Sequence, residues 1–102
     1  EALRRINEFN SQEMANTVWA FATAGVAART LFEAIATEAL RRINEFNSQA
    51  MANTVWAFAT ADIAARTLFG AIAAEALRRI NEFNSQEMAN TVWAFATAGV
   101  AA

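Results

Sequence analysis

The stretch Asn10-Ser-Gln-Glu-Met-Ala-Asn-Thr-Val-Trp-Ala-Phe-Ala-Thr-Ala24 decides the fold of this chain, because it occurs three times. It returns with small changes at residues 47–61 and 84–98, each time 37 residues further on. A fixed period of this length indicates tandem structural repeats. The 102 residues therefore divide into copies 1–37, 38–74 and 75–102, the last of them partial.

Each period predicts two helices. From about residue 29 to 46, apolar side chains recur at three- and four-residue intervals, which places them on one stripe of a first helix. A second helix is predicted over residues 48–60, where Met51, Val55 and Phe58 share one face. Two helices of this size cannot cover both apolar stripes by themselves, so the copies must stack.

We therefore expect an all-α fold, an α-solenoid of about 2.75 helical-hairpin repeats with a 37-residue period. Residues 1–102 form a single segment, which we expect to be part of a longer array. The first element is a half helix at Glu1–Glu8. First helices pack on first helices, and second helices on second helices.

The ends of the second helix carry local signals. Asn47 and its equivalents are suited to cap its first turn. Glu13 and Glu87 complete a capping box in copies one and three, whereas Ala50 loses the reciprocal bond in copy two. Glycine, at residues 25 and 99, suits the left-handed position that ends this helix. Asp62 takes that position in copy two, where we also expect it to cap the following helix.

Composition excludes several classes of function. The chain has no Cys and no His, which rules out disulfides, zinc sites with those ligands and His-based catalysis. No nucleophile, metal set or phosphate loop accompanies the carboxylates, so we expect no enzyme activity, no metal and no cofactor. The longest uncharged run, residues 14–28, is too short and too polar for a membrane span.

Arginine supplies all eight positive charges, and the net charge is −2. This balance lacks the basic excess that is typical of nucleic-acid binding. Arg4, Arg41 and Arg78 nevertheless recur in register, and a ladder of them could bind phosphates along a strand. The alternative is local neutralisation, because Glu38 stands three residues before Arg41 and favours an ion pair along the helix.

The second helices carry two further sets of candidates. Amide side chains stand four residues apart on the polar side and can either read base edges or hold neighbouring copies in register. They are Gln12, Asn16, Gln49, Asn53, Gln86 and Asn90. The Trp-Ala-Phe set at Trp19 and Phe21, with its copies, could stack nucleobases. We interpret it as core packing, because it falls on or beside the apolar stripe.

These residues also carry a family resemblance. The pattern Phe-Asn-x-Gln-x-φ-Ala-Asn-x-φ-Trp-Ala-φ-Ala, where φ is apolar, matches at 9–22, 46–59 and 83–96. It resembles the core of octotricopeptide and heptatricopeptide repeats, and Leu-Phe-x-Ala-Ile-Ala at 31–36 and 68–73 looks like their first helix. Tetratricopeptide repeats would need a period of about 34 residues and Tyr and Pro positions that are absent here.

The resemblance implies a non-catalytic module that binds single-stranded or structured RNA in a chloroplast or mitochondrion. It also implies RNA contact along the inner face of the solenoid, at Gln12, Asn16 and their copies. The family often carries an RNA-associated domain called RAP, which this chain lacks. The alternative function is a protein-interaction scaffold or a structural subunit of a large assembly, and the charge balance favours that alternative.

The ends of the array predict a further partner. Both terminal copies carry the apolar residues of the middle copy, and solenoids normally need polar capping repeats. We therefore expect Ile6 and Phe9 at one end, and Val92 and Phe95 at the other, to keep uncovered apolar surface. Other protein chains or flanking repeats would contact these ends. Head-to-tail stacking of identical chains would give open filaments unless it closed into a ring.

Overall fold

The computed structural model describes residue 6 and residues 8–26, 28–63 and 65–99. These residues form an all-helical fold, as predicted. The elements are α1 (Ser11–Thr23), α2 (Arg29–Arg41), the short 3₁₀ helix η2 (Ile43–Glu45), α3 (Ser48–Thr60), α4 (Arg66–Arg78), the 3₁₀ helix η3 (Ile80–Glu82) and α5 (Ser85–Ala98). The expected half helix at Glu1–Glu8 lies largely outside the described residues.

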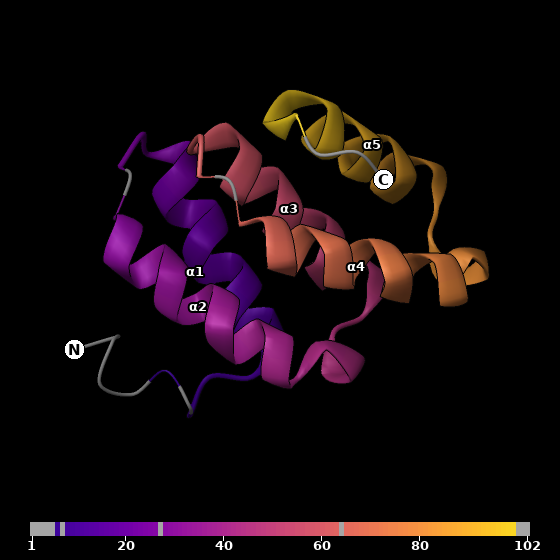
Figure 1. Ribbon diagram of the computed structural model, residues 1–102, viewed down its shortest axis with the longest axis horizontal. Helices are drawn as coiled ribbons and strands as arrows, with labels where there is room; N and C mark the ends of the chain where they lie inside the picture. The colour runs from indigo at the N-terminus through magenta and orange to yellow at the C-terminus, as the bar shows by residue number, and fades with distance from the viewer. Residues whose placement is uncertain (1–5, 7, 27, 64, 100–102) are drawn as a thin grey trace.

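Helices that are equivalent in sequence lie side by side. The second helices form one layer, in which α1 packs against α3 and α3 packs against α5. The first helices α2 and α4 contact each other in a second layer, nearer the viewer than α1 and α3 in Figure 1. Helix α4 also contacts α3 and η2, so it touches both layers of the preceding hairpin, which consists of α2, η2 and α3.

The core lies between these layers. Phe32 of α2 and Phe58 of α3 meet edge to face at 5.0 Å between ring centroids. Phe69 of α4 and Phe95 of α5 repeat the contact at 5.1 Å. Such aromatic pairs add to the stabilisation that comes from apolar burial alone. The stripe of Met51, Val55 and Phe58 predicted for the second helix is fully buried, which confirms it.

The caps at the start of the second helices are confirmed. Asn10 accepts a hydrogen bond from the backbone N–H of Glu13, and the carboxylate of Glu13 accepts one from the N–H of Asn10. Asn84 and Glu87 repeat this capping box. Asn47 accepts a bond from the N–H of Ala50, at 2.8 Å. The reciprocal bond is missing because Ala50 has no carboxylate, as predicted.

The ends of these helices are confirmed in part. Gly25 and Gly99 have the left-handed φ values of 75° and 71° that were predicted. Asp62, at the equivalent position of copy two, also has a positive φ, of 61°. Asp62 was predicted to cap the following helix, and it does not. Helix α4 begins after Ala65, three residues later, and has no side-chain cap.

The first helix is shorter than its apolar stripe predicts. It ends at Arg41, because Arg42 adopts φ −124° and ψ 30° and its N–H bonds to the carbonyl of Ala39, three residues back. The remaining apolar positions continue on η2 and on Phe46, which is fully buried. A periodic pattern thus survives a break in the helix, because the same side chains still reach the core. None of the helices in the described parts of the chain is long and apolar enough to cross a bilayer.

Candidate nucleic-acid interface

One outward surface of the second helices gathers amides and tryptophans. On each of α1, α3 and α5, a Gln, an Asn and a Trp stand at offsets of zero, four and seven residues. At 100° per residue these positions fall within an arc of about 60°, so they share one helix face. We call this surface the amide–Trp face, and it consists of Gln12, Asn16, Trp19, Gln49, Asn53, Trp56, Gln86, Asn90 and Trp93.

The tryptophans form a ladder across the three helices. The ring centroids of Trp19 and Trp56 lie 6.1 Å apart, with 30° between the ring planes. Those of Trp56 and Trp93 lie 6.3 Å apart, with 31° between the planes. Trp19 and Trp93 keep 44% and 46% of their surface exposed, and Trp56, between them, is half-buried. The ladder therefore presents indole surface to solvent along the whole row.

The amides form a second row beside the ladder. The side-chain NH₂ of Gln12 donates to the carbonyl oxygen of Asn16 at 3.0 Å, and Gln86 and Asn90 repeat this bond at 3.0 Å. Each bonded pair leaves the carbonyl oxygen of its Gln free to accept and the NH₂ of its Asn free to donate. All six amides are exposed or half-exposed. The first and third copies therefore each offer a paired donor and acceptor to a ligand, whereas Gln49 and Asn53 offer two separate amides.

The interpretation of the Trp-Ala-Phe set as core packing is right for its phenylalanines in copies two and three and wrong for the terminal tryptophans. Phe58 and Phe95 are buried, whereas Trp19 and Trp93 lie nearly half-exposed. The physical reason is that Trp is two positions before Phe, about 200° around the helix. The spacing of Gln12, Asn16 and Trp19 was the available signal that Trp shares the amide side.

The arginine candidates are held by neighbouring carboxylates. Arg41 and Arg78 are exposed, and each binds the Glu three residues before it, Glu38 or Glu75, at 2.7 Å. This confirms the local ion pairs that the sequence predicts for Arg41. Arg4 lies outside the described residues. The positive charges of Arg41 and Arg78 stand on the first helices, whereas the amide–Trp face is on the second helices.

The second arginine of each pair joins adjacent copies. Nε of Arg42 lies 3.1 Å from a carboxylate oxygen of Glu38, an ion pair whose geometry falls short of a hydrogen bond. Its guanidinium also donates to the backbone carbonyl of Phe9, in the preceding copy. Arg79 likewise pairs with Glu75, at 2.9 Å, but it donates to a different carbonyl of the preceding copy, that of Ile43, at 3.4 Å. These two arginines hold copies together.

The chemistry available here is that of recognition. Indoles stack on bases, and amides can accept and donate at base edges. Within the described parts of the chain, no group of three or more His, Cys, Asp or Glu is placed to hold a metal ion. The face thus offers stacking and hydrogen bonding without a charged centre.

The comparisons with known proteins bear on the same question. Residues 1–101 match the family described as RNA-editing substrate-binding complex 6 protein. The chain belongs to this family. No curated protein matches the chain.

The family corrects the resemblance drawn from the sequence motif. The chain is a member of an RNA-related helical family, and not of the octotricopeptide or heptatricopeptide repeats named for the pattern. Much of that pattern describes packing, since Ala15, Val18 and Ala22 of its first occurrence are buried. Apolar spacing of this kind is shared by stacked helical repeats in general, so it separates related repeat families poorly.

Proposed function

We propose that this chain is a non-catalytic RNA-binding segment of an α-solenoid, and that the amide–Trp face contacts a single RNA strand. The observation that supports this most is the continuity of the face across three helices, with indole centroids 6.1 and 6.3 Å apart. The family name refers to a complex that binds RNA-editing substrates. A role in such a complex fits a recognition surface without catalytic groups.

Each copy supplies what one nucleotide needs. Helical-repeat proteins can read one base per repeat with two or three side chains. Here a repeat offers an indole for stacking and an amide pair, such as Gln12 and Asn16, for hydrogen bonds. An RNA strand that crosses α1, α3 and α5 in turn would meet three sites with the same three residue types. Gln49 and Asn53, with Trp56, form the middle one.

Charge predicts how the complex responds to salt. The net charge is −2, and Arg41 and Arg78 are already paired with carboxylates. Each phosphate that a protein neutralises on a single strand adds about −0.7 to the slope of log K against log salt concentration. We expect stacking and amide contacts to supply most of the affinity here, with a shallow slope between zero and about −2.

The location follows the proposed role. RNA-editing complexes occur in mitochondria, so we place this protein there and drop the chloroplast alternative. The family name also implies protein neighbours within a complex. A protein-interaction scaffold remains the second candidate function, because an apolar groove between α4 and α5 lies open to solvent.

Binding of fluorescein-labelled single-stranded RNA, measured by anisotropy at several salt concentrations, tests the proposal. Trp19→Ala and Trp93→Ala suit the test because both side chains are nearly half-exposed. Each substitution should weaken binding roughly 5- to 150-fold, since stacking one base on an aromatic ring is worth about 1–3 kcal/mol. Val26→Ala removes an equally exposed apolar side chain away from the face and serves as the matched control.

Two results would contradict the proposal. One is unchanged affinity in both Trp variants, which would place the RNA elsewhere. The other is affinity that falls steeply with salt and depends on Arg41 and Arg78, which would make the arginine ladder the binding surface. Retained binding by Val26→Ala, with loss in both Trp variants, supports the face.

A further inference from the structure

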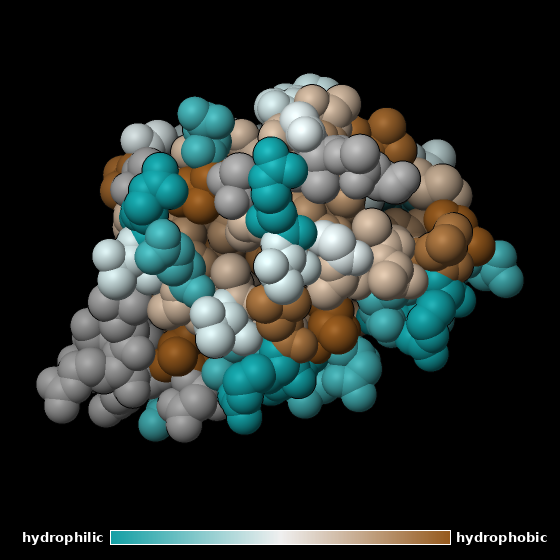
Figure 2. Space-filling view, viewed as in Figure 1, coloured by the Kyte–Doolittle hydropathy of each residue, from teal (hydrophilic) through white to brown (hydrophobic). Residues whose placement is uncertain are grey.

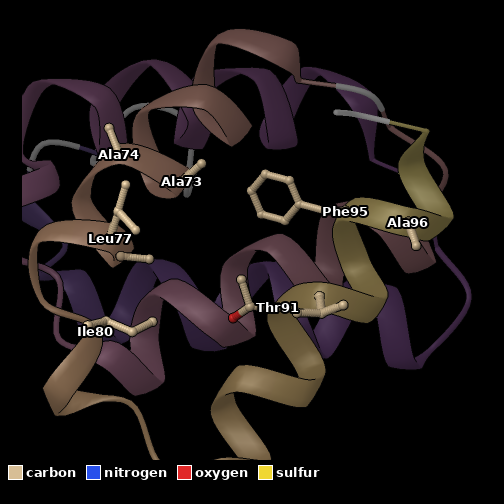
Figure 3. Close-up of a pocket in the computed structure, with 9 residues that line it drawn as sticks. Ala73, Ala74, Leu77, Ile80, Thr91, Phe95 and Ala96 are labelled. Atoms are coloured by element: carbon tan, nitrogen blue, oxygen red, sulfur yellow. The ribbon is translucent and has the colours of Figure 1, made fainter. Parts of the chain in front are cut away.

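The last copy carries an open apolar groove between α4 and α5. Ala73, Leu77 and Ile80 line one side, and Val92, Phe95 and Ala96 line the other. Its volume is about 640 Å³. Figure 3 shows Leu77 and Ile80 facing Thr91 and Phe95 across it. Apolar atoms also gather between α5 and the end of α4 in the space-filling view (Figure 2).

The same residues are covered in the middle copy. Val55 is fully buried, whereas its equivalent Val92 is 68% exposed. Ala59 is 5% exposed, whereas Ala96 lies open. The lining residues on the second helix are identical in type in the two copies, so the difference comes from what packs on them.

Beside α5, which also packs on α3, helix α4 covers the middle copy. It contacts α2, α3 and η2, whose equivalents one repeat later are α4, α5 and η3. Those three elements carry the lining of the open groove. A helix placed on the last copy as α4 is placed on the middle copy would therefore lie in the groove. It would bring an apolar stripe like that of Leu68, Phe69 and Ile72, which are buried in α4.

Contacts between an arginine and a methionine of the preceding second helix show the same stacking of one copy on the next. Arg42 reaches the sulfur of Met14 at 3.6 Å, and Arg79 reaches that of Met51 at 3.8 Å. Each is the arginine that follows the first helix of the next copy. Met88 is the third equivalent, and it is 40% exposed. Met88, four residues before Val92 on α5, is thus open to contact by an arginine that follows an incoming helix.

From these observations we propose that the α4–α5 groove binds an amphipathic helix of the repeat's own first-helix type. Its sequence would follow Arg-Thr-Leu-Phe-x-Ala-Ile-Ala-x-Glu-Ala-Leu-Arg-Arg, the pattern of residues 29–42 and 66–79. The apolar stripe fills the groove, and the last arginine, paired with the Glu four residues before it, reaches Met88 and the carbonyl of Ile80. The partner is therefore a protein segment that carries a further copy of this repeat.

A fluorescein-labelled peptide with the sequence of residues 28–46 tests this, with anisotropy measured against the full chain. The peptide should bind saturably at one site per chain. Val92→Asp, at the open groove, should weaken peptide binding at least tenfold. Val26→Asp is the matched control because Val26 is also exposed, at 50%, but lies away from the groove. That variant should bind like the wild type.

Changes in the peptide test the two ends of the contact separately. Phe32→Ala in the peptide shortens its apolar stripe and should abolish binding. Arg42→Ala in the peptide removes only the end contact and should weaken binding several-fold. Single-stranded RNA binding by Val92→Asp should stay unchanged, which separates this proposal from the proposed function.

Two outcomes would overturn the proposal. The first is no saturable binding of the peptide, and the second is equal binding by Val92→Asp and wild type.

Discussion

Helices α3 and α5 have the same sequence over their first thirteen residues except for Ala50 and Glu87, yet they bury different side chains. In α3, Met51 and Val55 are fully buried, whereas Met88 and Val92 of α5 are 40% and 68% exposed. The intrinsic preferences of the residues are equal, so the neighbours decide. A repeat in this protein acquires its core from the copy that follows it.

The prediction that both terminal copies keep uncovered apolar surface is therefore confirmed only in part. Val92 is exposed, as predicted, but Phe95 is 6% exposed because Phe69 of α4 packs on it. Ile6 and Phe9 are half-buried. Open surface at the end of a stack thus appears where the next copy would sit, while the contact with the preceding first helix stays complete.

The largest expected effect on stability comes from comparing Val55→Asp with Val92→Asp, which place the same charge at equivalent positions of α3 and α5. Val55→Asp buries an unpaired carboxylate in a fully buried site, and we expect a loss of more than about 4 kcal/mol in the free energy of unfolding. Val92→Asp should change it by less than about 0.5 kcal/mol, because surface changes rarely cost more. Urea unfolding followed by circular dichroism measures both. Equal losses would show that the two copies pack alike.

The tryptophan ladder gives an intermediate effect. A fully buried aromatic side chain at this position would make Trp56→Ala cost about 3–5 kcal/mol in the free energy of unfolding. Because Trp56 is only half-buried, we expect roughly 1–3 kcal/mol, since the apolar area removed from water is smaller. Trp93→Ala should cost less, because only one indole neighbours it. Thermal unfolding of the two variants measures these losses of stability. A larger loss for Trp93→Ala than for Trp56→Ala would contradict the ladder.

Asp62 and Gly99 both adopt a left-handed backbone conformation, so substitutions at the two positions can be compared. Asp62 holds φ of 61°, where a β-carbon is unfavourable. Asp62→Gly should therefore raise stability by up to about 1 kcal/mol, and Gly99→Asp should lower it by a similar amount. At Gly99 an added β-carbon meets nothing within 4 Å, so the effect is one of backbone strain. A melting temperature lowered by Asp62→Gly would refute this account.

The smallest difference concerns the helix caps. Asn84→Ala and Asn47→Ala each remove a cap worth about 0.5–2 kcal/mol. Asn84 belongs to a full capping box and Asn47 does not, so the loss at Asn84 should be larger by a few tenths. Chemical unfolding of both variants, with Ala50→Glu as the variant that restores the box residue to copy two, measures the difference. A larger loss at Asn47 would be inconsistent with the reciprocal bond.

Local signals allowed the second helices to be predicted well. The Asn caps and the left-handed residue at their end bound a short helix on both sides, and α3 spans Ser48–Thr60 as predicted. The first helix was predicted too long, because the apolar period continues through the break at Arg42. Periodicity reports which side chains face the core, and it does not report whether the backbone between them stays helical.

The candidate site was predicted only in part. The amides were found because polar residues on an otherwise apolar helix stand out. Trp19 and its copies were assigned to the core, because aromatic residues usually supply burial there. Their ladder depends on contacts between three helices, with centroids about 6 Å apart. Periodicity within one helix cannot reveal such contacts.

The central claim is that the amide–Trp face is where RNA binds, and NMR of a ¹⁵N-labelled chain tests it most directly. Addition of a short single-stranded RNA should shift the three indole N–H signals and the side-chain amide signals of the face. The backbone signals of α2 and α4, which carry Arg41 and Arg78, should move little. Shifts confined to the arginines and their neighbours, or none at saturating RNA, would contradict the account.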